Sequence, residues 1–151
     1  MQSRRKTLQH GAAVAGVLAT AALLPSRAFA WNKAGFESKT IADAAKAFGG
    51  TSVAQSGAVT ITGPDIAENG AVVPLGAATT LPGVKHLLIM VEKNPNALVA
   101  MFNVSDSVEP NFATRAKMGQ TSDVYAVAIT GDGKAHFAKK EVKVTLGGCG
   151  G

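Results

Sequence analysis

The stretch "VKHLLIMVEKNPNALVAMFNVS", residues 84–105, decides the fold. It holds two apolar runs, each of strand length, separated by the turn sequence NPN. Both runs are apolar on both faces of the expected strand, and so is "VYAVAI" at residues 124–129. A sandwich of two sheets requires only one apolar face per strand. The second face therefore needs a cover, and either a helix of this chain or a partner protein can supply it.

Further strand-like segments lie on both sides of this stretch, with turn signals about ten residues apart. They are "AVTITGP" (58–64), "NGAVVPLGAAT" (69–79), "DVYAVAITG" (123–131) and "EVKVTL" (141–146), with "ATRAKMGQ" (113–120) as a further candidate. One helical segment precedes them, "SKTIADAAKAFGG" (38–50), whose apolar residues fall on one face. Ser38 or Thr40 can cap this helix, and Gly49 and Gly50 end it. The pattern predicts a mainly β fold, an immunoglobulin-like sandwich of about seven strands with one N-terminal helix.

The first 30 residues have the three-part plan of an export signal. Arg4 and Arg5 precede a 14-residue apolar run, and Ala28, Phe29 and Ala30 form an A-x-A cleavage site. As a helix the run would span about 21 Å, which is short of a bilayer core, so no membrane anchor is expected. The adjacent arginines favour the twin-arginine route, which carries folded proteins, over an ordinary secretory signal. Cleavage after Ala30 predicts a periplasmic protein.

The basic character of the chain belongs largely to this signal. The full sequence carries 15 basic and 10 acidic residues, but four of the basic ones precede the predicted cleavage site. The mature chain is close to neutral, and nothing in its charge indicates binding to nucleic acid. His86 and His136 lack metal-ligand spacing and are predicted to be structural, while Met90, Met101 and Met118 are predicted to fill the core or an interface. No cofactor is expected.

Cys149 is the only cysteine, and Gly147, Gly148, Gly150 and Gly151 surround it in the terminal "GGCGG". Glycine pays the largest entropy on ordering, so the segment 147–151 is predicted to be a flexible arm beyond a domain of residues 31–146. Five extended residues reach at most about 17 Å, enough to enter a deep pocket of another protein. The local sequence has no base or cation to activate the thiol. These features favour a covalent carrier arm rather than a catalytic cysteine.

The terminal "GGCGG", the segment "IAENGAVVP" (66–74) and the twin-arginine front end together resemble the SoxY family, the sulfur-compound carriers of the thiosulfate-oxidising Sox system. The resemblance covers essentially the whole chain. It implies a carrier that is not an enzyme, with Cys149 as the attachment residue and the four glycines as a swinging arm. It also implies an immunoglobulin-like sandwich that forms a heterodimer with a small β-protein, SoxZ.

The resemblance further implies a reaction cycle on Cys149. A haem c enzyme couples thiosulfate to the thiol, giving a cysteine S-thiosulfonate, and a dimanganese thiosulfohydrolase then releases sulfate. Where present, a molybdenum-haem sulfane dehydrogenase oxidises the remaining sulfur, and a second hydrolysis frees the thiol.

Two other classes of protein are compatible with parts of the sequence. An exported structural or adhesion module could use Cys149 for an interchain disulfide. A ubiquitin-like carrier also ends in Gly-Gly, but its chemistry needs ATP, which an exported chain does not meet, and its fold disagrees with the sandwich pattern.

Overall fold

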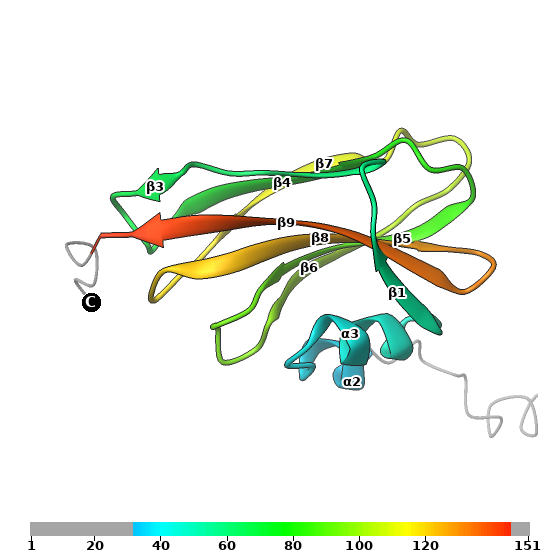
Figure 1. The fold of residues 1–151 in the computed structure, drawn as a ribbon, viewed down its shortest axis with the longest axis horizontal. Helices are drawn as coiled ribbons and strands as arrows, with labels where there is room; N and C mark the ends of the chain where they lie inside the picture. The colour runs from blue at the N-terminus through cyan, green and yellow to red at the C-terminus, as the bar shows by residue number, and fades with distance from the viewer. Residues whose placement is uncertain (1–31, 146–151) are drawn as a thin grey trace, which may run out of the picture. The chain divides into compact units, whose positions relative to one another are not determined.

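A computed structural model describes residues 32–145 of the chain as two packed β-sheets with two short helices (Figure 1). The predicted signal, residues 1–30, and the predicted arm with Cys149, residues 147–151, lie outside the described residues. The predicted mainly β sandwich is confirmed. No helix within residues 32–145 is long and apolar enough to cross a membrane.

The larger sheet has the strand order β1-β9-β8-β5-β6, and the short strand β3 also pairs with β9. Three of its strands, β5, β6 and β8, come from the segments that are apolar on both faces. The bounds are β1 Ser52–Gln55, β3 Ile66–Ala67, β5 Val84–Val91, β6 Leu98–Asn103, β8 Ser122–Thr130 and β9 Lys134–Val144. The hairpin between β8 and β9 turns at Asp132-Gly133, where Gly133 has a φ of 81°.

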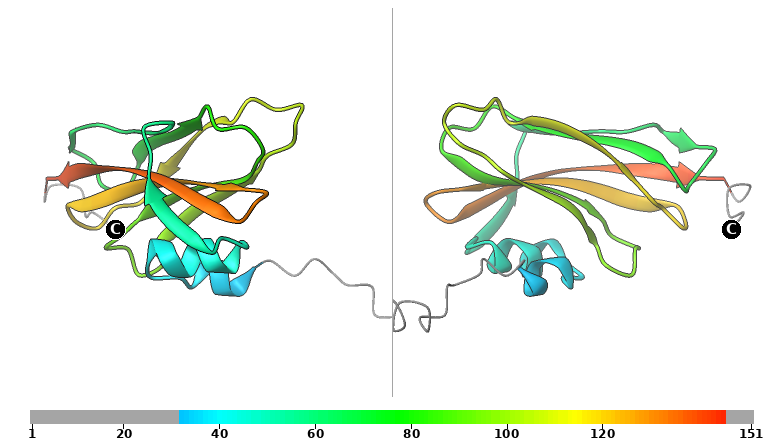
Figure 2. Two further views of the ribbon diagram at one scale, coloured as in Figure 1. Left: turned by 45° about the vertical axis from the view of Figure 1, so that its right-hand side comes forward. Right: turned by 180° about the vertical axis from the view of Figure 1, so that it is seen from behind.

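The smaller sheet has the order β2-β4-β7 and faces one side of the larger sheet (Figure 2). Its strands are β2 Val59–Thr62, β4 Val73–Thr79 and β7 Asn111–Ala116, all antiparallel to their neighbours. Along β4 buried and more accessible residues alternate, as expected for a strand with one face on the core.

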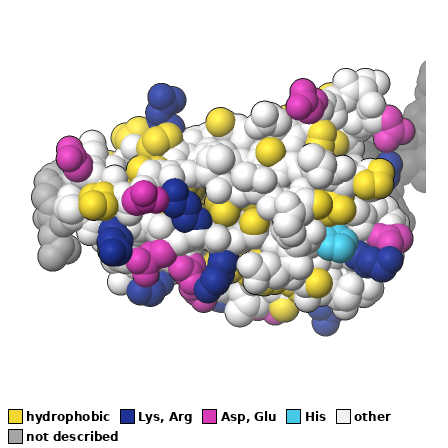
Figure 3. Space-filling model, turned by 45° about the horizontal axis from the view of Figure 1, so that its top comes forward, with side chains coloured by type: hydrophobic (Ala, Val, Ile, Leu, Met, Phe, Trp, Pro, Cys, Tyr) yellow, Lys and Arg dark blue, Asp and Glu magenta, His cyan; other side chains and the backbone are white. Residues whose placement is uncertain are grey.

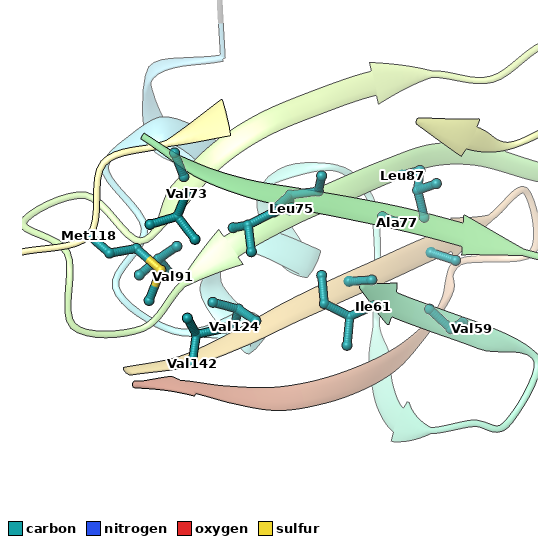
Figure 4. Packing of buried hydrophobic residues seen from close by; sticks show 14 of the residues in the cluster. Val59, Ile61, Val73, Leu75, Ala77, Leu87, Val91, Met118, Val124 and Val142 are labelled. Carbon is teal, nitrogen blue, oxygen red and sulfur yellow. The ribbon is translucent and has the colours of Figure 1, made fainter. Parts of the chain in front are cut away.

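Two sets of buried side chains follow from this layering. Leu87, Ile89 and Val91 of β5 face the smaller sheet and belong to the inter-sheet core, part of which is drawn in Figure 4. Leu88 and Met90 of the same strand face the opposite way and belong to a second cluster. All five are at most 1% exposed, so both faces of β5 are buried.

The second face of the larger sheet is covered by the N-terminal helices, α2 (Lys33–Phe36) and α3 (Ile41–Ala47). Ala44 and Ala45 of α3 are buried against it, as the apolar stripe predicts. Thr40 is the N-cap of α3, since its hydroxyl accepts from the amide of Asp43 at 3.1 Å. A helix of this chain is thus the cover of that face. The prediction of one helix was wrong, because Asn32 caps a second short helix, α2.

The strand count also differs from the prediction of about seven, because residues 32–145 contain nine strands. The two-residue β3 and the strand β1, whose four residues are all exposed, lack an apolar pattern and were not predicted. Strand β9 begins at Lys134 rather than near Glu141, since it continues directly from the hairpin turn.

Candidate functional site

The site that the sequence indicates is the C-terminal end of β9, from which the chain continues toward Cys149. Cys149 and its four neighbouring glycines lie outside the described residues, so the structure describes the anchor of this segment. Thr145 is the last described residue. The end of β9 is held by β8 on one side and by β3 on the other (Figure 2).

Backbone hydrogen bonds to β3 hold one edge of the strand end. The amide of Lys143 donates to the carbonyl of Asp65 at 3.0 Å, and the amide of Thr145 donates to the carbonyl of Ala67 at 3.1 Å. On the other edge, the amide of Val144 donates to the hydroxyl of Thr121 at 3.0 Å. Three successive amides are therefore bonded alternately to the two sides, which fixes the direction in which the chain leaves the domain.

We call these backbone contacts around the end of β9 the clamp. The segment Ile66–Pro74, which is part of the family resemblance, contributes to it. Its first two residues are β3, and the Asn69 side chain closes a turn by accepting from the amide of Ala71 at 2.9 Å. The Gly70 carbonyl then accepts from the amide of Met118 at 2.7 Å. The segment thus joins the end of β9 to the loop after β7.

Gly70 is required here by its missing side chain. A Cβ at this position would collide with the carbonyl oxygen of Met118 and lie 2.8 Å from Cγ1 of Val144. Its backbone can therefore approach both neighbours only because the residue is glycine.

Tightly packed side chains lie beneath the clamp. Val73, Met118 and Val142 are at most 1% exposed, and they group with Val91 and Val124 at this end of the core (Figure 4). Met118 and Met90 are thus core residues, as predicted, and Met101 is half-buried. The strand end rests on a rigid, close-packed base.

The surface around the strand end carries charges of both signs (Figure 3). Lys140 Nζ lies 2.8 Å from Oδ1 of Asp65 and also donates to the carbonyl of Gly63 at 2.6 Å. The hydrogen bond from Lys140 to Asp65 and the positive charge of Lys140 lower the pKa of the Asp65 carboxyl. Two apolar side chains of the clamp segment, Ile66 and Val72, are 57% and 51% exposed.

His86 and His136, the histidines of the described residues, lie apart from this site. His86 Nδ1 lies 3.0 Å from Oδ1 of Asn103, and its ring tilts against Phe48, whereas His136 is half-buried on β9. Within residues 32–145 no group of three or more His, Cys, Asp or Glu residues could hold a metal ion.

Sequence reasoning missed Asp65 and Thr121, which help to hold the strand end. Asp65 follows the Gly-Pro pair that ends β2, and Thr121 lies in a polar loop before β8. No local sequence pattern at either position predicts its contact with β9, which lies more than 20 residues away in the chain.

Comparison with known families and structures gives consistent results. Residues 44–149 match the family model described as "Sulfur oxidation protein SoxY". Among solved structures, the sulfur carrier protein SoxY from Chlorobium limicola f thiosulfatophilum is 38% identical, with a TM-score of 0.61. That alignment covers 68% of this chain and 92% of that chain.

More distant structures share only the fold. A variant of the superoxide reductase (neelaredoxin) from Ignicoccus hospitalis is 15% identical over 58% of this chain and 79% of that chain, with a TM-score of 0.51. No curated protein sequence matches the chain.

Proposed function

The chain belongs to the SoxY family of sulfur-oxidation carrier proteins, and from this premise we propose that Cys149 holds its sulfur cargo covalently. The cargo derives from thiosulfate and is oxidised to sulfate while attached. The single observation that carries the proposal is the extent of the family match, which runs to residue 149 and so includes the only cysteine. The clamped end of β9 supports it, because a carrier must release its arm from a fixed point.

The length of the arm limits the part of the domain surface to which the partner enzymes can bind. Cys149 follows Thr145 by four positions, so the cysteine Cα lies at most about 14 Å from the anchor. An enzyme that receives the thiol must therefore approach the clamp, where Ile66 and Val72 are exposed. Gly147, Gly148, Gly150 and Gly151 make the arm thin enough to enter a narrow channel.

The proposed cycle starts with oxidation. The thiol sulfur of Cys149 bonds to the outer sulfur of thiosulfate, giving the S-thiosulfonate Cys–S–S–SO₃⁻, and one proton and two electrons are released. The haem c coupling enzyme takes up the electrons. Cys149 needs no base of its own in this scheme, since the receiving enzyme supplies the environment that activates the thiol.

Hydrolysis follows on the same cysteine. Water attacks the terminal sulfonate, so sulfate and a proton leave and the persulfide Cys–S–SH remains. This step is assigned to the dimanganese thiosulfohydrolase. A sulfane dehydrogenase then oxidises the outer persulfide sulfur with three waters to the S-sulfonate Cys–S–SO₃⁻ and takes up six electrons while seven protons are released. A second hydrolysis releases sulfate and a proton and restores the thiol. The chain acts throughout as a carrier subunit.

The place of action is part of the proposal. Residues 1–30, with Arg4 and Arg5, direct export by the twin-arginine route, and cleavage after Ala30 leaves the carrier in the periplasm. Proteins of the SoxY family work with partners of the Sox system such as SoxZ. The folded-cargo route allows a partner without its own signal to be exported in the same complex.

Mass spectrometry of the C-terminal peptide tests the function. The mature chain, with its SoxZ partner, is incubated with thiosulfate and the purified haem c coupling enzyme. We expect one added –S–SO₃⁻ group on Cys149, and none on Cys149→Ser, whose circular dichroism and thermal melting should match those of the wild type. Loading of Cys149→Ser, or no loading of the wild type, would overturn the proposal.

The alternative, a structural module linked by an interchain disulfide, makes the opposite prediction for the same peptide. Its cysteine would be found wholly as a disulfide dimer in cells grown on thiosulfate.

A further inference from the structure

Strand β6, Leu98–Asn103, forms an open border of the larger sheet (Figure 1). It is the last strand in the order β1-β9-β8-β5-β6 and is hydrogen-bonded to β5 alone. We infer that an edge strand of the carrier's β-protein partner, apolar in its middle, adds to this border and extends the sheet. The inference rests on the proposed function, which gives the chain such a partner.

The alternation of hydrogen bonds shows which backbone groups are open. The amide of Val104 donates to the carbonyl of Lys85 at 2.9 Å, so this pair is of the hydrogen-bonded class. Antiparallel neighbours alternate between bonded and non-bonded pairs, and His86↔Asn103 and Leu88↔Met101 are therefore non-bonded. The N–H and C=O groups of Asn103 and Met101 point away from β5. Among the described residues no other backbone group bonds to them.

The side chains of β6 do not protect this border against pairing. Exposed edges are usually blocked by charged residues, proline or very short strands, but β6 is six residues long and has the uncharged sequence LVAMFN. Val99, Ala100, Met101 and Phe102 are only half-buried, whereas the corresponding part of β5 is fully buried. By contrast, the border strand β7 of the smaller sheet carries the exposed Arg115.

Aromatic side chains continue this surface to the smaller sheet. Phe102 of β6 stacks on Phe112 of β7 with ring centroids 4.5 Å apart and planes 4° from parallel. Both rings are half-buried. A strand that pairs with β6 would thus also cover the seam between the two sheets, which adds apolar burial to the backbone hydrogen bonds.

Charge limits the kind of strand that fits. The loop after β6 presents the exposed Asp106 and Glu109, and neither is in an ion pair within residues 32–145. The fitting partner strand is apolar in its middle and carries lysine or arginine at the end that meets this loop. A second copy of this chain fits less well, because Lys93, just before the start of its β6, stands next to the acidic Glu92.

Hydrogen–deuterium exchange tests the assignment directly. The probe is purified SoxZ from the same Sox system, mixed with the mature chain. We expect the amides of Met101 and Asn103 to exchange at least roughly tenfold more slowly in the complex, while amides on the outer face of the smaller sheet are unchanged. Protection on another surface, a complex without protection at β6, or pairing of β6 with a second copy of this chain would overturn the inference.

Two pairs of matched variants complete the test. Asn103→Pro removes the outward N–H, and Asn103→Ala keeps it, so only the proline variant should weaken SoxZ binding, by roughly tenfold. Asp106→Lys with Glu109→Lys should weaken binding by roughly tenfold, unlike the control pair Glu68→Lys with Glu141→Lys, which changes the net charge equally. Equal binding by test and control would contradict the inference. The variant with Asp106→Lys and Glu109→Lys still tests the inference if the proline variant does not fold.

Cys149 loading distinguishes this inference from the proposed function. If thiosulfate still loads Cys149 while SoxZ protects a surface other than β6, the inference fails and the carrier function stands. If SoxZ pairs with β6 but Cys149 is never loaded, the carrier function fails and the interface stands.

Discussion

The two ends of β9 are held in different ways. The pairing at its start extends the larger sheet, whereas the pairing at its end positions the chain that leaves the domain. At its start, residues Lys134 to Phe137 pair with all four residues of β1. Every residue of β1 is exposed, and of these four β9 residues only Ala135 is buried, so most of this pairing lies at the surface. At its end, β9 pairs with only two residues of β3. That shorter pairing lies over the fully buried Val142 and beside Gly70, whose backbone lies close to Met118 and Val144.

The number of paired residues therefore does not decide how firmly a strand end is held. Backbone bonds at the surface exchange with water and contribute little net free energy. Close packing beneath the clamp resists displacement, because neither Gly70 nor Val142 can shift without a collision or a cavity. Under the proposed function, the arm needs this rigidity at its root and not at the opposite end of the strand.

The largest effect is expected from Gly70→Ala. The new Cβ collides with the carbonyl of Met118, a backbone atom that cannot rotate away, so we expect unfolding free energy to fall by about 2 kcal/mol. Urea unfolding measures it. Gly119→Ala is the matched control, because a Cβ there has no atom within 4 Å and should change stability by less than about 0.5 kcal/mol. Equal effects of the two variants would mean that the clamp is not tightly packed.

Sequence patterns predicted most of the fold for a physical reason. The apolar strands, the helix α3 and the turn at Asp132-Gly133 are all encoded within about ten residues, where periodicity and turn chemistry operate. Strands β1 and β3 escaped prediction because pairing with β9 alone defines them, and neither presents a regular apolar face to the core.

The site was predictable in part. The lone cysteine among glycines predicts a carrier arm, which lies outside the described residues, and the segment Ile66–Pro74 contributed to the family resemblance without a structural reason for its presence. The structure supplies that reason, since the segment grips the end of β9. The contributions of Asp65 and Thr121 depend on contacts between distant parts of the chain, which no local pattern reports.

A smaller effect is expected from Thr121→Val, which removes the acceptor of the Val144 amide. Losing one hydrogen bond should cost about 1 kcal/mol and raise the exchange rate of that amide roughly fivefold. Hydrogen exchange followed by NMR measures both ends of β9 at once. The matched variant is Thr51→Val, which removes a hydroxyl bond to Gly133 at the other end and should leave the Val144 amide unchanged. A faster Val144 amide in both variants would contradict separate anchoring of the two ends.

The smallest effect concerns the ion pair of Asp65 and Lys140. The hydrogen bond from Lys140 lowers the pKa of Asp65, so the folded state favours the charged carboxylate. The resulting stability is present above the ordinary carboxyl pKa and is lost as the pH falls through the lowered one. Asp65 is solvent-exposed, and the contribution is therefore small. Wild type and Asp65→Asn should differ in urea midpoint at neutral pH and converge in acid, whereas Asp106→Asn, with no ion pair within residues 32–145 to lose, should show no such convergence. A difference between wild type and Asp65→Asn that persists in acid would show that the Asp65 side chain acts at the clamp through its shape rather than its charge.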